Sequence, residues 1–189
     1  NPDSEWIPTA RANGILLADA APTGGGIAGT SAVIQLDGWT SEDTTFLAPA
    51  GLQVQWPNMQ VAHPDPKQAK KRKEARDKAL ERIQKAFDEA RAYYKAREAG
   101  LGHDSDLRWD AMVPVLTRQI PVFVRADEYR QIEAAADWSM TEDLRLVIIG
   151  GQDAWRSAEK LKAHDVPVIL QGTFRMPRRR WDPYDAAYA

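Results

Sequence analysis

The 189-residue sequence contains no cysteine and only three histidines, His63, His103 and His164. The lack of cysteine excludes disulfide bonds, thiolate zinc sites and cysteine nucleophiles, and it leaves the redox compartment and the cellular location open. A zinc site would then need at least three ligands from His, Asp and Glu, and no histidine lies in an HxH or HExxH arrangement. We therefore expect no metal ion and no other cofactor to be bound by residues of this chain.

The sequence also lacks a long apolar run and an excess of charge of either sign. No stretch approaches the roughly 18 apolar residues that a membrane span needs. Lys and Arg number 25 against 27 Asp and Glu, so the net charge is −2. We therefore expect no membrane partner, and we do not expect nucleic acid to be the partner, because no global electrostatic attraction to it exists.

Strand and helix signals alternate in the second half of the chain. Residues 120–125, 144–149 and 166–170 are short apolar runs rich in β-branched residues, which is typical of buried strands. Residues 127–140 and 153–163 between them carry apolar residues at helical spacing. Helices that join short apolar strands make βαβ units, and these predict a parallel sheet with right-handed crossovers.

Sheets of this kind bind ligands just beyond the carboxyl ends of their strands. Arg125 at such an end would bind a small carboxylate or amide ligand, or stabilise developing negative charge. Asp127 would orient Arg125 or cap the following helix, and the Gly150–Gly151 turn would let a ligand approach the backbone. No catalytic residue is assigned, and the candidate ligand-binding residues are Arg125, Asp127, Gly150, Gly151, Gln152 and Gln171.

Residues 66–99 form the clearest single element, a helix without internal Gly or Pro. An apolar stripe at three- and four-residue steps comprises Leu80, Ile83, Phe87, Ala90 and Tyr94. Since about 34 residues make roughly 50 Å of helix, we expect it to fray or break near its basic start or to project toward a partner. Residues 67–82 carry an excess positive charge of +5. This charge is typical either of a nucleic-acid-binding surface or of a solvated helix face with Glu–Lys pairs, and the net charge of the chain favours the solvated face.

The remaining segments give weaker signals. Residues 9–13 indicate the end of a helix, residues 14–20 a strand after it in another αβ step, and residues 104–118 a further helix. Short extended segments are expected at 31–36, 44–47 and 52–54. The glycines at 24–26 lack the Lys and the following helix of a phosphate loop, so a turn is expected. The run Arg178-Arg179-Arg180-Trp181 suits a phosphate or carboxylate clamp, or arginines paired with acids.

Three runs of the second half, residues 122–132, 144–155 and 158–170, resemble the later βα units of the amidohydrolase superfamily. Within that superfamily the likeness is to imidazolonepropionase-related proteins. The front segment, residues 13–38, resembles a middle strand and loop of such barrels. The resemblance implies a TIM barrel that binds zinc or another divalent metal and hydrolyses C–N bonds in amides.

The metal ligands of that family do not carry over onto this sequence. Arg125 stands at the position of the fifth-strand histidine, and Gly150 stands at that of the sixth-strand histidine. A guanidinium offers only donors, and glycine has no side chain, so neither can ligate a cation. The HxH pair of the first strand and the eighth strand have no counterpart.

The expected fold class is therefore α/β, a partial TIM-barrel-like parallel sheet with βαβ units and one long helix. We expect residues 1–189, which begin without Met, to be a single domain and an internal fragment of such a barrel, with residues 66–99 as an insertion. Catalysis by this chain is not expected. The alternative is a non-catalytic binding or self-assembly module, in which the long helix and the Arg-rich tail are contact surfaces and open sheet edges favour self-association.

Overall fold

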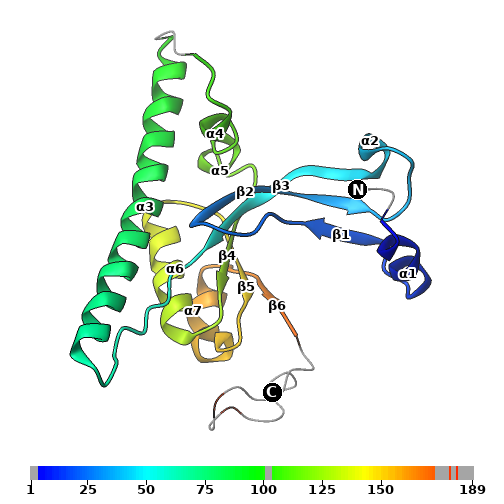
Figure 1. Cartoon of the computed structure of the whole chain (residues 1–189). Helices are drawn as coiled ribbons and strands as arrows, with labels where there is room; N and C mark the ends of the chain where they lie inside the picture. Colours follow the sequence, from blue (N-terminus) through cyan, green and yellow to red (C-terminus); the bar gives the residue numbers. More distant parts are fainter. Residues whose placement is uncertain (1–3, 101–103, 173–178, 180–181, 183–189) are drawn as a thin grey trace. The chain divides into compact units, whose positions relative to one another are not determined.

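The computed structural model describes residues 4–100, 104–172, 179 and 182. Its six strands hydrogen-bond in chain order from β1 to β6 (Figure 1). The chain forms two compact units, residues 1–55 with 81–122 and residues 56–80 with 123–189. None of the described helices combines the length and the apolar character that a membrane crossing requires.

The first unit contains an antiparallel three-stranded meander. Its elements are α1 (Trp6–Ala12), β1 (Leu17–Ala20), β2 (Ile27–Gln35), α2 (Ser41–Thr44) and β3 (Thr45–Gln55). Helix α1 ends at Asn13, as the sequence indicates. The expectation that the strand after it belongs to an αβ step of a parallel sheet is wrong, because β1 pairs antiparallel with β2, and β2 with β3. The reason is the short glycine-containing connection between β1 and β2, which reverses the chain but cannot make a parallel crossover.

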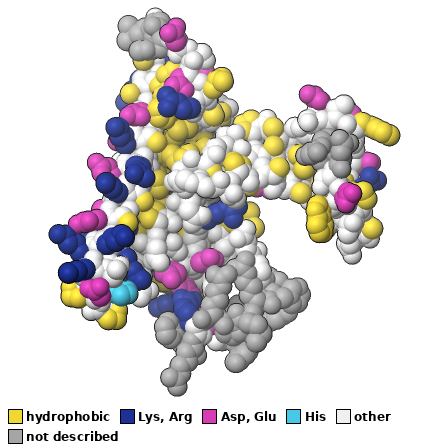
Figure 2. Space-filling view, in the orientation of Figure 1, with side chains coloured by type: hydrophobic (Ala, Val, Ile, Leu, Met, Phe, Trp, Pro, Cys, Tyr) yellow, Lys and Arg dark blue, Asp and Glu magenta, His cyan; other side chains and the backbone are white. Residues whose placement is uncertain are grey.

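The long helix is present as predicted and runs unbroken as α3 (Pro66–Glu98). Its basic start does not interrupt it, because Ala, Lys, Glu and Arg are all strong helix formers. The centre of the predicted apolar stripe, Ile83, Phe87 and Ala90, is buried. Positive and negative side chains are interspersed along this helix (Figure 2), with ion pairs Lys70–Glu74 at 3.9 Å and Lys85–Glu89 at 3.8 Å.

The helix expected over residues 104–118 is instead two single turns, α4 (Leu107–Asp110) and α5 (Val113–Leu116). Asp106 caps the first turn by accepting a hydrogen bond from the Arg108 N–H. Pro114 at the start of the second turn lacks the N–H that a continuous helix would use, so the two turns stay separate.

The second unit contains the predicted βα alternation. Its elements are β4 (Val122–Ala126), α6 (Tyr129–Thr141), β5 (Leu146–Gly150), the 3₁₀ turn η1 (Ala154–Ser157), α7 (Ala158–Ala163) and β6 (Val168–Leu170). Strands β5 and β6 are parallel, with Ile148 opposite Val168. The expected helix over residues 153–163 begins as η1 before it becomes α7.

The strand order continues from β3 to β4. Within the first unit the Leu52 N–H donates to the Pro121 carbonyl, and within the second unit the Trp56 N–H donates to the Arg125 carbonyl. The predicted α/β class with a partial barrel-like sheet, βαβ units and one long helix is therefore confirmed, with an antiparallel first part as the difference. That residues 1–189 are a single domain and residues 66–99 an insertion stays a prediction.

The two sides of β4 differ in burial. Val122, Val124 and Ala126 are buried, while Phe123 and Arg125 between them are half-buried. Helix α6 begins at the end of this strand and buries a stripe of Ile132, Ala135, Ala136 and Ser139. Alternation therefore separates Arg125 from the apolar side of the strand and places its side chain on the other side.

Candidate functional site

The structure brings the carboxyl ends of β4, β5 and β6 together, as the βαβ reading requires. The Gly151 N–H donates to the Ala126 carbonyl at 2.9 Å, and the Gln171 N–H donates to the Gly150 carbonyl at 3.4 Å. The Asp153 N–H donates to the Asp127 carbonyl at 2.9 Å. The strand ends that carry the sequence-predicted residues are thus held to one another by backbone hydrogen bonds.

Arg125, the last but one residue of β4, is the central candidate. Its side chain is half-buried, and it forms no hydrogen bond or ion pair with another residue that the structure describes. Its backbone carbonyl accepts the Trp56 N–H at 3.3 Å, so the main chain is fixed while the guanidinium is unengaged. A half-buried cation without a protein counter-ion is unusual, because burial of an unpaired charge costs free energy.

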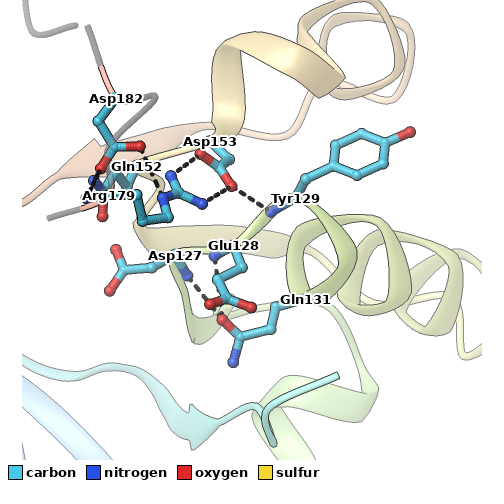
Figure 3. Close-up of polar contacts among 8 residues, drawn as sticks. All are labelled: Asp127, Glu128, Tyr129, Gln131, Gln152, Asp153, Arg179 and Asp182. Atoms are coloured by element: carbon cyan, nitrogen blue, oxygen red, sulfur yellow. Dashed lines mark hydrogen bonds and ion pairs between the residues drawn. The ribbon is translucent and has the colours of Figure 1, made fainter. Parts of the chain in front are cut away.

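Asp127 follows the end of β4, and the expectation that it caps the next helix is wrong. The N-cap of α6 is Glu128, which has extended backbone angles. The Gln131 Oε1 accepts hydrogen bonds from the backbone N–H groups of Asp127 at 3.3 Å and of Glu128 at 3.2 Å. In Figure 3 the Asp127 carboxylate points away from this helix start.

Gln131 also fixes the segment that precedes α3. Its Nε2 donates to the carbonyls of Trp56 at 3.3 Å and Pro57 at 3.2 Å. One amide side chain therefore connects the turn after β4 with the backbone that follows β3. No sequence pattern pointed to this residue, because its partners lie more than 70 positions away.

The two glycines at the end of β5, its last residue Gly150 and the following Gly151, accommodate neighbouring side chains. A Cβ atom on Gly150 would lie 2.5 Å from the Asp127 Oδ1, and one on Gly151 would lie 2.5 Å from the Val168 Cγ1. Both glycines also have positive φ, of 107° and 65°, which other residues adopt at a cost. The Asp127 carboxylate thus occupies the space that a side chain at residue 150 would need.

Gln152 and Asp153 connect the same turn to the chain beyond β6 (Figure 3). The Gln152 Nε2 donates to the Asp182 Oδ2 at 3.1 Å. The Arg179 guanidinium donates to both oxygens of Asp153, at 2.5 and 2.9 Å, and its Nε donates to the Asp182 Oδ1 at 2.8 Å. The side chains of Asp153 and Asp182 are each only 6% exposed, so this ion-pair cluster is largely shielded from water.

The charges of this cluster stabilise one another. Burial raises the pKa of the Asp153 carboxyl, but hydrogen bonds from Arg179 and the Tyr129 N–H outweigh it and lower the pKa below its ordinary value. The hydrogen bond to Asp153 raises the pKa of Arg179. The sequence allowed two interpretations of the Arg-rich tail, and Arg179 agrees with the one in which arginines pair with acidic residues. Arg178, Arg180 and Trp181 lie outside the described residues.

At the two positions where the resemblance implies metal ligands, residues 125 and 150, the side chains do not fit a metal centre. Arg125 has no lone pair to donate, and a side chain at Gly150 would meet the Asp127 carboxylate. Within residues 4–100, 104–172, 179 and 182, no three or more His, Asp and Glu side chains come together as a cation site would require. His63 accepts a hydrogen bond from the Asp65 N–H through Nδ1, within its own loop.

The fold is similar to that of a known enzyme. The crystal structure of an amidohydrolase from Thermotoga maritima superposes with a TM-score of 0.81 at 21% sequence identity, over 95% of this chain. The chain spans about half of that protein, 48% of its length. No family model matches the sequence, and no curated protein matches it either. The likeness shows an amidohydrolase-like fold, and at this identity it shows the fold alone.

Proposed function

We propose that this chain is a ligand-binding variant of the amidohydrolase-like barrel, which binds a small carboxylate or amide ligand at the end of β4 and does not catalyse hydrolysis. The observation that carries the proposal is the half-buried Arg125 guanidinium, which has no counter-ion among the described residues. A guanidinium binds a carboxylate through two parallel hydrogen bonds, and such charge-assisted pairs are about twice as strong as neutral ones.

The fold supports a ligand site at the carboxyl end of β4, and the charged residues there support the binding of a polar ligand. Strand-end residues of α/β barrels bind ligands, and Arg125 and Asp127 occupy such an end. We also propose that the chain is related to imidazolonepropionase-related proteins. The runs at residues 122–132 and 144–155 support this relation. C–N bond hydrolysis is then the chemistry of the parent family, with a divalent metal that the residues at 125 and 150 do not support here.

Nuclear magnetic resonance titration with butyrate, a simple monocarboxylate, tests the binding site. We expect saturable shifts of the backbone amides of residues 125–127 and their loss in Arg125→Ala. Arg130→Ala is the matched control, because Arg130 is an exposed arginine on α6 of the same unit and should bind like the wild type. Equal titration of Arg125→Ala and the wild type would refute the proposal.

Metal analysis of the purified chain tests the non-catalytic part separately. Without added chelator, we expect no stoichiometric zinc, iron or manganese by mass spectrometry. Near-stoichiometric metal would contradict this part of the proposal and restore hydrolysis as the function, since a metal-bound water is the nucleophile that such enzymes use.

Self-association is the second candidate, and exposed apolar side chains of the first unit favour it. Leu17 on β1 and Phe46 and Leu47 on β3 are 48%, 65% and 51% exposed. Strand β1 is also at one end of the strand order, so its outer backbone groups are available for pairing. Light scattering at high concentration tests this candidate, since a clean monomer would remove its support, and Phe46→Ser should weaken any association.

A further inference from the structure

Asp127 has a backbone that is held on both sides and a carboxylate that no described residue engages. The Asp127 N–H is bound by Gln131, and its carbonyl accepts the Asp153 N–H, so the backbone is fixed on both sides. The carboxylate itself accepts no hydrogen bond from a described residue, and the view in Figure 3 draws contacts to its backbone only. It is half-buried, so it does not have the full hydration of a surface aspartate.

Gly150 leaves room for the Asp127 carboxylate. Any side chain at residue 150 would place its Cβ atom 2.5 Å from the Oδ1 and 3.1 Å from the Cγ of Asp127. The absence of a side chain at that position therefore leaves the space in which the carboxylate lies. Among the described residues no donor fills the other side of it, so an acceptor is available to a ligand.

Arg125 and Asp127 carry opposite charges and lie two residues apart, Arg125 in β4 and Asp127 directly after its last residue, Ala126, yet no ion pair joins them. The Cα atoms of alternate residues in an extended chain are roughly 6.6 Å apart, so a short ligand is long enough to reach from one residue to the other. A ligand that carries a carboxylate at one end and an N–H donor at the other could satisfy both side chains at once.

We propose that Arg125 and Asp127 together recognise a short ligand with a carboxylate at one end and an ammonium or amide N–H group at the other. This inference rests on the proposed function and deepens it, because it names the second group of the ligand. Arg125 binds the carboxylate through its guanidinium. Asp127 accepts the N–H, and Gly150 is a positioning residue because its lack of a side chain leaves room for the acceptor.

Three four-carbon carboxylates of similar length separate the two contacts. Butyrate offers the carboxylate alone, succinamate adds a terminal amide, and 4-aminobutyrate adds a terminal ammonium. By nuclear magnetic resonance titration, we expect the wild type to bind 4-aminobutyrate about ten-fold more tightly than butyrate, with succinamate between them, because a charge-assisted hydrogen bond is gained.

Variants assign each contact to its residue. Asp127→Asn should reduce the preference for 4-aminobutyrate over butyrate to less than about three-fold. Gly150→Ala should have the same effect, because the new Cβ displaces the carboxylate. Asp127→Glu retains the charge and should retain part of the preference, and Glu159→Gln, an exposed acid on α7, is the matched control. Thermal unfolding of each variant verifies that it is folded.

The outcomes distinguish this inference from the proposed function. If the wild type binds all three ligands equally and Arg125→Ala loses all three, the role of Asp127 is refuted and carboxylate binding stands. If Asp127→Asn keeps the full preference, the inference is likewise refuted. If no ligand binds, or Arg125→Ala binds as the wild type does, the proposed function fails and the inference fails with it.

Discussion

The Arg179 guanidinium and the Asp153 carboxylate form a two-point ion pair, with N–O distances of 2.5 and 2.9 Å. Asp153 accepts a further hydrogen bond from the Tyr129 N–H at the start of α6. Arg179, which follows β6 in the chain, is therefore joined to the turn after β5 and to the start of α6. Because the Asp153 side chain is only 6% exposed, its charge depends on Arg179 rather than on water for stabilisation.

Asp153→Ala should destabilise the second unit by about 2–4 kcal/mol, because it leaves Arg179 without its main partner and the Tyr129 N–H without an acceptor. Urea unfolding, followed by intrinsic fluorescence, measures the change. Asp77→Ala is the control, since the Arg76–Asp77 pair is a surface pair on α3 and its loss should cost less than about 1 kcal/mol. Equal costs for the two variants would contradict the prediction.

The Asp153–Arg179 pair also predicts how stability depends on pH. The folded-state pKa of Asp153 is lowered from its ordinary value of 3.8, so the unfolded chain takes up the proton first as the pH falls. The contribution of this carboxylate is fully present above that ordinary value and is lost as the pH falls through the lowered pKa. The free energy of unfolding should therefore fall more steeply with acidification in the wild type than in Asp153→Asn, and parallel profiles would refute this.

The sequence predicted those parts of the fold whose signals are local. The β-branched runs at 120–125 and 144–149 and the helical spacing between them indicated β4, α6 and β5, because residues close in sequence determine these elements. The long helix followed from the composition of residues 66–99 for the same reason. Strand ends in a βαβ unit meet at one edge, so the neighbourhood of Arg125 and Gly150 could also be predicted.

Other features depended on contacts that no local pattern contains. The direction of β1 and β2 is determined by the turn between them and by pairing register, which the untidy alternation of residues 14–54 did not indicate. The bridge from Gln131 to Trp56 depends on the three-dimensional fold alone. Asp127 was expected at the helix cap because Asp is a favoured cap, but the preceding strand places Glu128 there.

The contact between Gly150 and Asp127 predicts energetic coupling between the two residues. Gly150→Ala should cost about 2–3 kcal/mol, from the crowding of the Asp127 Oδ1 and from the positive φ. In an Asp127→Ala background the crowding is gone and the φ strain remains, so the cost should fall by about 1 kcal/mol or more. A double-mutant cycle measured by urea unfolding gives this coupling. Strict additivity would show that the carboxylate does not occupy the space above Gly150.

Gln131→Ala should loosen the turn after β4. The change removes the acceptor of the Asp127 and Glu128 N–H groups and the donor to the Trp56 and Pro57 carbonyls, so we expect a loss of about 1–2 kcal/mol. Hydrogen exchange should accelerate at the amides of residues 127 and 128 more than at the centre of α6. Uniform exchange along this segment would instead show that Gln131 contributes nothing local.

Trp56 provides a test of the core of the second unit. It is 3% exposed and its ring centroid lies 5.2 Å from that of Trp138, while its Nε1 has no hydrogen-bond acceptor among the described residues. Trp56→Phe keeps an aromatic contact and removes an unsatisfied buried donor, so these effects offset each other and the cost should be less than about 1.5 kcal/mol. Trp56→Ala should cost about 3–5 kcal/mol, because it leaves a cavity beside Trp138. Similar unfolding free energies for the two variants would mean that the ring packing contributes little, whereas a large loss in Trp56→Phe would mean that the indole N–H has a partner that stabilises the fold.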